Sequence, residues 1–200
     1  MSSPAFLYGA NSEDFSKNGL PAAFELISNN LPPLWLALYE PADIRKIPNA
    51  DVADFSALFF TSRTNAAIAR LEARRNHLAL ALPDGAVQIH GMMVDFLKQS
   101  ASLYIQCDPS QLLGIQDADD GWMETLSNIL RAFDARPKQV VRQKGLFGTV
   151  EEEVFSPGWK SFLRYFPLAS RSGNRDSQKV FAGLLAGNAD NGETPWDHDD

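Results

Sequence analysis

Three arginines recur along one predicted helix and are the residues best suited to binding chemistry. Arg63, Arg70 and Arg74 are spaced by seven and four residues, so in a helix they cluster on one face. A guanidinium group donates planar, paired hydrogen bonds that match the oxygens of phosphate and carboxylate groups. The three side chains could therefore bind an anion. A helix face that is simply exposed to solvent explains the same arginines.

Three carboxylates precede the most clearly amphipathic segment of the chain. Asp117, Asp119 and Asp120 stand just before, or in the first turn of, a helix predicted over about residues 120–134. Carboxylates there accept hydrogen bonds from free N–H groups and oppose the positive end of the helix dipole. The alternative role is recognition of a basic partner. A calcium loop is disfavoured, because Gly121 comes too early and the ligand ladder is incomplete.

No other pattern in the chain indicates a catalytic or metal-binding set. His77, His90 and His198 have no histidine or cysteine at zinc spacing. The sequence contains no nucleophile elbow, no P-loop and no dinucleotide-binding glycine pattern. The single cysteine, Cys107, lies in an apolar run and is expected to pack in the core. We therefore predict no catalytic residue, no metal and no cofactor.

Two similar apolar runs are expected to organise the fold. Residues 31–44 and 102–113 each hold a short apolar stretch, then an acid, a proline and, after two more residues, Ile or Leu. Their aromatic and branched residues suit a pleated surface, and the acid–proline step disfavours continued helix, so both are predicted as buried strands. Amphipathic segments precede them at residues 22–29 and 92–100. The similarity predicts an internal helix–strand–turn–helix duplication or a chance resemblance.

Helical periodicity predicts most of the remaining elements. Ala67, Ile68 and Leu71 fall on one side of a helix that is expected to begin after Thr61 or Ser62. His77–Leu82 is favoured as more helix, since Leu and Ala are strong helix formers, although a hairpin would also suit its alternation. Further along, residues 135–155 suggest one or two β segments, and Ser156-Pro157-Gly158 is typical of a helix start.

These elements predict a single α+β domain over about residues 4–167, rich in helix and with a small sheet. Residues 168–187 are expected to be a polar linker with a short apolar island, and residues 188–200 an acidic, disordered tail. The predicted core consists of Trp35, Leu36, Phe96, Ile105, Leu126, Ile129 and Phe133.

The charge of the chain is uneven. The net charge is −7, with −7 over residues 1–135, +5 over residues 136–179 and −5 over residues 180–200. An acidic body attracts a basic protein partner. The basic segment could bind nucleic acid, but the overall acidity counts against it.

The compartment is expected to be the cytoplasm. A lone cysteine suits a reducing environment. The first residues lack the basic and apolar regions of a signal peptide. No apolar run approaches the roughly 20 residues that a membrane helix needs, so no membrane contact is predicted.

A resemblance points to a function class. Ala5-Phe6-Leu7-Tyr8, and residues 31–44 followed by an amphipathic helix, resemble small acidic bacterial proteins of unassigned function. Some of these are suspected immunity proteins, which neutralise toxins passed between bacteria. The resemblance covers about the first two-thirds of the chain and brings no catalytic residues. It implies a cytoplasmic binding protein.

Two function hypotheses follow. The first is a non-enzymatic binding protein, for example an immunity factor that covers a basic toxin with an acidic surface, including Asp117, Asp119 and Asp120. The alternative is an enzyme with a non-motif active site, which would act on a phosphate-containing or anionic small molecule through the three arginines.

Overall fold

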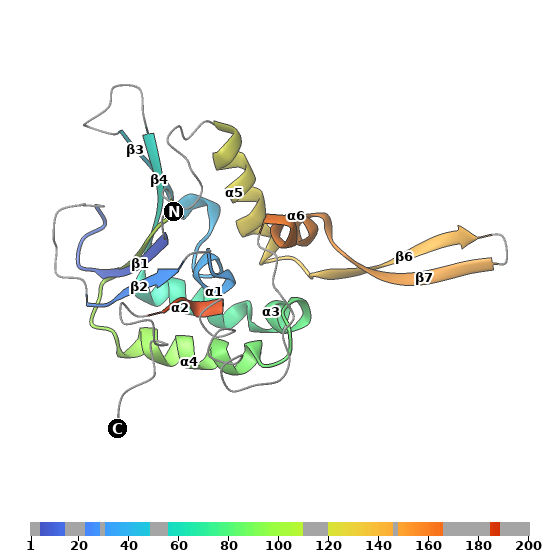
Figure 1. Cartoon of the computed structure of the whole chain (residues 1–200), viewed down its shortest axis with the longest axis horizontal. Coiled ribbons are helices and arrows are strands. Elements are labelled where there is room, and N and C mark those ends of the chain that lie inside the picture. Colours follow the sequence, from blue (N-terminus) through green and yellow to red (C-terminus); the bar gives the residue numbers. More distant parts are fainter. Residues whose placement is uncertain are drawn as a thin grey trace.

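A computed structural model describes residues 5–14, 23–28, 31–48, 56–109, 120–145, 148–165 and 185–188. Within these ranges the fold is α+β, as predicted. It contains six α-helices, a five-stranded antiparallel sheet and a separate two-stranded hairpin (Figure 1). The sheet is therefore a major layer and not the small one expected from the sequence.

The main sheet has the strand order β2-β1-β5-β4-β3, and each neighbouring pair is antiparallel. Its strands are β1 (Ala5–Ala10), β2 (Glu25–Ser28), β3 (Ile44–Pro48), β4 (Ser56–Arg63) and β5 (Tyr104–Asp108). The three middle strands, β1, β5 and β4, begin at residues 5, 104 and 56, so the sheet joins segments that are far apart in sequence.

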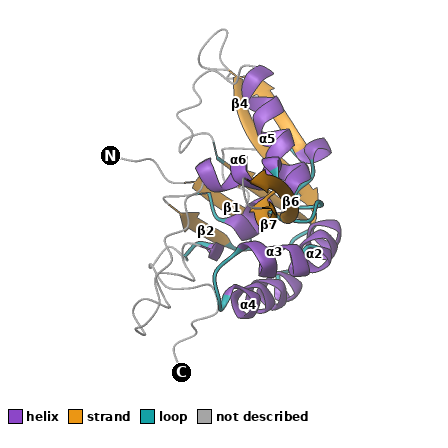
Figure 2. Cartoon of the chain, turned by 90° about the vertical axis from the view of Figure 1, so that its right-hand side faces the viewer, coloured by secondary structure: helices purple, strands orange, loops and turns teal. Residues whose placement is uncertain are grey.

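The helices form two groups. The α-helices are α1 (Pro33–Leu36), α2 (Thr64–Ala73), α3 (Arg75–Ala81), α4 (Ala86–Gln99), α5 (Asp120–Ala132) and α6 (Pro157–Tyr165), and a 3-10 turn, η1, spans Pro41–Asp43. Helices α2, α3 and α4 pack together on one side of the molecule (Figure 2). Helices α5 and α6 pack on each other, at the place where the hairpin leaves the body (Figure 1).

The first apolar run requires a correction. Pro33–Leu36 form a short helix and not a strand, whereas the second run forms β5 as predicted. Pro32 is extended and Pro33 takes the first helical position, where its fixed φ suits a helix. The leucines that follow are good helix formers. Since the two runs adopt different structures, the described residues show no duplication.

Two further corrections concern the sheet. Glu25–Ser28, expected in an amphipathic helix, form strand β2, where burial alternates with the period of two of a strand. Beside it, Phe6 and Tyr8 lie in β1, between β2 and β5. Thr61 and Ser62 belong to β4, and α2 begins beyond them at Thr64. The propensity of short segments is easily overridden by pairing with distant strands.

The other helix predictions are confirmed. His77–Leu82 was expected to be helical, and α3 covers all of this segment except Leu82, which is the helix C-cap. The predicted helix over about residues 120–134 is α5, and Ser156-Pro157-Gly158 does start α6. The β segments expected within residues 135–155 are β6 (Lys138–Gly145) and β7 (Gly148–Phe155), which form the separate hairpin.

The apolar side chains of the described residues form one continuous core. Of the predicted core set, Phe96 is partly buried and packs against this core. The other members are fully buried: Trp35, Leu36, Ile105, Leu126, Ile129 and Phe133. Cys107 is also buried, as expected.

A late segment of the chain completes this core around Trp35. Leu185 and Ala186 are buried, and the Trp35 Nε1–H donates to the Ala186 carbonyl over 2.7 Å. Gly187 has a φ of +75°, and a Cβ there would lie 2.3 Å from Trp35 Cζ2. Asn188 exchanges backbone hydrogen bonds with Ile27. Part of the apolar island predicted inside the polar linker thus packs on the body. Residues 189–200 lie outside the described part of the chain.

An aromatic cluster holds α6 on α5. The rings of Phe133, Trp159 and Phe162 meet edge to face, with centroids 5.2–5.5 Å apart. The Trp159 Nε1–H donates to the Ala135 carbonyl over 3.2 Å. Edge-to-face pairs contribute roughly 0.5–1.5 kcal/mol each beyond burial. This cluster therefore fixes both ends of the segment from which the hairpin extends.

His90 provides a pH-dependent contribution to stability. It is buried on α4, and its Nε2 lies 2.7 Å from the Leu71 carbonyl, which makes Nε2 the donor and leaves Nδ1 unprotonated. Nδ1 has no partner within the described structure. Burial lowers the pKa of His90 below its ordinary 6.5. The folded state therefore resists protonation of this ring.

We predict that the free energy of unfolding falls as the pH drops below about 6.5, because the unfolded chain then binds a proton at His90 that the folded chain rejects. Above this pH the contribution is fully present. In His90→Gln this decline should be smaller between pH 7.5 and 5.5. Denaturant titrations at several pH values measure both slopes. Equal slopes in the two proteins would show that His90 does not titrate as described.

Candidate functional site

The structure places Arg74 inside the body. It lies between α2 and α3, and its side chain is only 3% exposed. Its Nη1 donates to the carbonyls of Ala37 (2.9 Å) and Tyr39 (2.6 Å). Its Nε and Nη2 each lie 2.7 Å from an oxygen of Asp134. All of these acceptors belong to the chain itself, so Arg74 is not available to an external anion.

Arg70 is also occupied by its own chain. Its guanidinium contacts Glu40 at 2.6 Å and Asp43 at 2.9 Å. It also donates to the Ser62 hydroxyl over 2.8 Å. Like Arg74, Arg70 connects helix α2 with the segment that follows α1. The three predicted arginines therefore do not form one anion-binding surface, since two of them are internal connectors.

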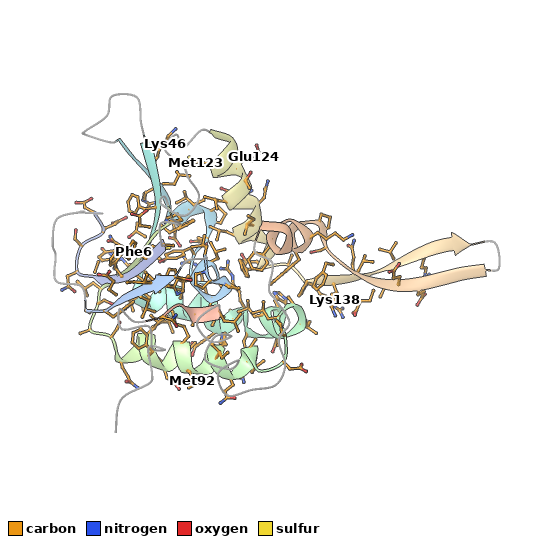
Figure 3. The ribbon with its side chains drawn as sticks, viewed as in Figure 1. Phe6, Lys46, Met92, Met123, Glu124 and Lys138 are labelled. Carbon is orange, nitrogen blue, oxygen red and sulfur yellow. The ribbon has the colours of Figure 1, made fainter. Side chains whose placement is uncertain are left out.

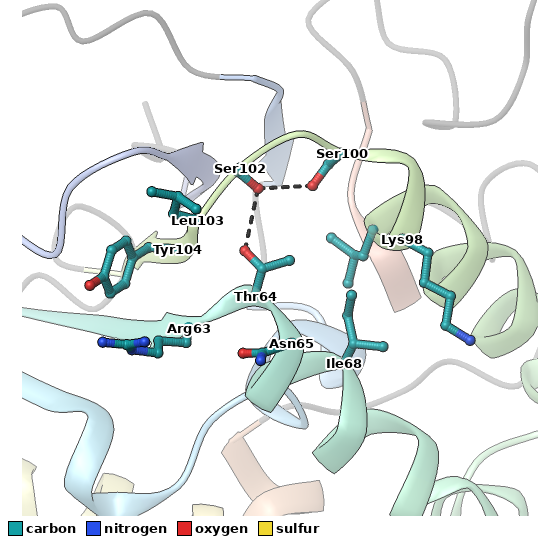
Figure 4. A pocket seen from close by; sticks show the side chains of 10 residues that line it. Arg63, Thr64, Asn65, Ile68, Lys98, Ser100, Ser102, Leu103 and Tyr104 are labelled. Atoms are coloured by element: carbon teal, nitrogen blue, oxygen red, sulfur yellow. Dashed lines mark hydrogen bonds between the residues drawn. The ribbon is translucent and has the colours of Figure 1, made fainter.

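Arg63 differs from the other two. It is exposed at the end of β4, and it makes no ion pair with any described residue. It lines a cavity of about 570 Å³ where β4 meets α2 and α4 meets β5 (Figure 4). Arg63 therefore borders a space that a small ligand could occupy.

The predicted acidic site is only partly placed. Asp120 is the first residue of α5, in agreement with the predicted helix start. Its side chain, Asp117 and Asp119 lie outside the described part of the structure. Helix capping and partner recognition both remain predictions for these three residues.

The β6–β7 hairpin contains none of the predicted site residues. It projects away from the body as a long arm (Figure 1). Its strands pair with each other from Lys138↔Phe155 to Gly145↔Gly148, and neither pairs with the main sheet. Isolated two-stranded hairpins are at best marginally stable in water. A long hairpin that pairs with no other described strand is therefore an unusual element.

One face of this arm has a recognisable organisation. Residues directly opposite each other in a strand pair point to the same side. The face that we call the Val140 face consists of Lys138, Val140, Arg142, Glu151, Glu153 and Phe155. Arg142 binds Glu151 at 2.7 Å, and Lys138 approaches Glu153 at 3.6 Å. Between these ion pairs Val140 is 62% exposed. The face is thus an apolar centre within a charged, internally paired border.

The root of the arm is anchored. The Ser156 N–H donates to the Pro137 carbonyl over 2.7 Å and closes the base of the hairpin. Lys138, which Figure 3 places at this base, lies over the Phe155 ring at 5.6 Å. Phe155 is partly buried and packs against the core. The arm is therefore presented from a fixed point next to α5 and α6.

The free cysteine Cys107 is buried. Burial raises the pKa of the Cys107 thiol well above its ordinary value, so the thiolate is not formed near neutral pH. The described part of the chain contains no cluster of three or more metal-ligating side chains. None of its helices has the length and apolar character needed to cross a membrane.

Comparison with known proteins gives no match. No protein-family model, curated protein or solved structure shows significant similarity to this chain.

Tyr39, which lies beside the Arg70 and Arg74 contacts, contains a polar atom without a partner. Its ring stacks on Phe60 and is fully buried, and its hydroxyl has no hydrogen-bond partner within the described structure. Burial raises the pKa of this phenol well above its ordinary value, so the group stays neutral. A buried hydroxyl without a partner destabilises the folded state.

We expect Tyr39→Phe to raise the free energy of unfolding by about 1 kcal/mol, because it removes this unpaired hydroxyl and keeps the ring. Tyr104→Phe is the matched control; its side chain is half-buried, so the change should stay within about 0.5 kcal/mol. Urea denaturation measures both. A loss of stability in Tyr39→Phe would mean that the hydroxyl has a partner.

Proposed function

We propose that the protein is a non-enzymatic binding protein that contacts another protein through the Val140 face of its hairpin arm. The observation that carries this proposal is the exposed Val140 between two ion pairs, on a hairpin that pairs with no other described strand. Protein interfaces commonly combine an apolar centre with a polar border.

The arm is suited to binding because it is organised before the partner arrives. Its ion pairs and its anchored root limit the motions that association would otherwise have to restrict. Groups already held in the bound arrangement lose less conformational freedom on binding. Burial of Val140 would then contribute affinity directly, by about 25 cal/mol for each Å² of apolar surface removed from water.

The charge of the chain favours a basic partner. The net charge is −7, and β7 contributes the consecutive acids Glu151, Glu152 and Glu153. Glu151 and Glu153 are balanced by Arg142 and Lys138 on the Val140 face. Glu152 points to the other face and has no ion pair among the described residues. Asp117, Asp119 and Asp120 are proposed as a second acidic contact.

An immunity factor that covers a basic bacterial toxin is the specific form of this proposal. Its support is the sequence resemblance together with the acidic balance of the chain. The arm would act by occlusion, since a stoichiometric inhibitor needs a surface and not a catalytic residue. Multiple-turnover conversion of a substrate by the purified protein would contradict this proposal.

The test compares two lysine substitutions that change the net charge equally. Val140→Lys places an ammonium at the centre of the Val140 face and should reduce partner capture at least tenfold, because apolar interface centres carry much of the binding energy. Leu80→Lys changes a residue on α3 that is 50% exposed and should leave capture unchanged. The free energy of unfolding of each variant should lie within about 1 kcal/mol of that of the unsubstituted protein.

The full-length chain is immobilised, incubated with lysate of the source cells and washed, and the retained proteins are quantified by mass spectrometry. A third variant replaces residues 139–154 with Asn-Gly and keeps Lys138 and Phe155 at the root. The proposal expects the same protein to be lost with Val140→Lys and with the shortened arm, and kept with Leu80→Lys. Equal capture by all variants contradicts it. Capture should also weaken as salt rises.

A further inference from the structure

A second feature of the molecule, independent of the arm, is the cavity that Arg63 lines. Its volume of about 570 Å³ could hold a small organic molecule. The cavity lies where the chain passes from β4 into α2 and from α4 into β5 (Figure 4). Its walls therefore belong to the central sheet and the helix layer, which makes the space part of the folded body.

The charged groups of the cavity are all positive. Arg63 and Lys98 are among its lining residues, and none of the lining residues is acidic. Lys98 is 2.7 Å from Glu72, which balances much of its charge, whereas Arg63 has no ion pair among the described residues. In a chain of net charge −7, a cavity with cationic and no acidic walls is a local exception. It favours an anionic ligand.

Hydroxyl groups lie between the two cations. Ser102 is buried, and its hydroxyl is 2.8 Å from that of Ser100 and 3.4 Å from that of Thr64 (Figure 4). The Asn65 side chain accepts from the Ala66 N–H at 2.8 Å, so its amide group remains able to donate. A carboxylate needs few such donors. A phosphate group, with three terminal oxygens, can use the hydroxyls together with a guanidinium.

The rest of the cavity wall is apolar or aromatic. Ile68 and Leu97 come from α2 and α4, and Leu103 and Tyr104 come from the start of β5. Leu103 is a large apolar side chain that is mostly exposed. Ile68 and Leu97 are buried, so it is mainly Leu103 and Tyr104 that offer a surface for an apolar or ring-shaped body attached to the anion. Inorganic phosphate alone would leave that surface unused.

We propose that this cavity binds a small-molecule phosphate monoester with an apolar or aromatic body. The Arg63 guanidinium, the Thr64 hydroxyl and the Asn65 amide bind the phosphate. Leu103 and Tyr104 contact the body of the ligand, beside Ile68 and Leu97. The site does not depend on the hairpin, so loss of partner binding through Val140 leaves it intact.

The test is a titration of the full chain with three probes, followed by amide and methyl NMR. Phenyl phosphate carries both the anion and the ring, inorganic phosphate carries the anion alone, and benzyl alcohol carries the ring alone. Phenyl phosphate is expected to bind at least tenfold more tightly than either of the others. Its shift changes should centre on Ile68, Leu97 and Leu103. Changes centred elsewhere, or equal binding of benzyl alcohol, overturn the proposal.

Two arginine substitutions with the same change in net charge complete the test. Arg63→Gln should weaken phenyl phosphate binding roughly tenfold, since a charge-assisted hydrogen bond is lost. Arg75→Gln, at an exposed position on α3, should change it less than twofold. Thr64→Val keeps the side-chain shape and should also weaken binding. Equal effects of the two arginine substitutions on binding would contradict the proposed site. Thermal melts check that each variant is folded.

Discussion

The fold depends on one buried guanidinium group. Arg74 binds the carbonyls of Ala37 and Tyr39 and both oxygens of Asp134, and its guanidinium lies 5.8 Å from the Phe133 ring. These partners stand 35 to 60 positions away in the chain. A buried charge without such partners would be strongly destabilising. Arg74 therefore requires that the segment after α1, the α2–α3 junction and the end of α5 come together.

This requirement connects the two functional proposals. The end of α5 leads through the aromatic cluster to the root of the hairpin, so the position of the arm is set by contacts around Phe133. Helix α2, whose C-cap is Arg74, begins at Thr64 beside the cavity. Through Asp134, Arg74 thus links the α5–α6 pair that positions the arm with the helix that bounds the cavity.

The sequence predicted those elements whose pattern is local. Leu126, Ile129 and Phe133 recur at helical spacing, and α5 follows from them. Pro33–Leu36 were mistaken for a strand because an apolar run of this length suits either structure, although Pro33 suits the first position of a helix. The roles of Arg70 and Arg74 could not be predicted, because their acceptors are distant carbonyls and carboxylates. The exposure of Val140 could not be predicted either, because it depends on the hairpin forming a sheet separate from the main one.

The most direct test of the central role of Arg74 is a double-mutant cycle with Asp134. Arg74→Met, Asp134→Ala and the double variant are unfolded with urea at pH 7, and the four free energies give the coupling between the two side chains. The cost of leaving the Ala37 and Tyr39 carbonyls unpaired occurs in both arms of the cycle and cancels. Asp134 is 60% exposed, which weakens the pair, so we predict a coupling of at least about 1 kcal/mol. Additivity within about 0.3 kcal/mol would contradict the claim that this contact joins the two parts of the fold.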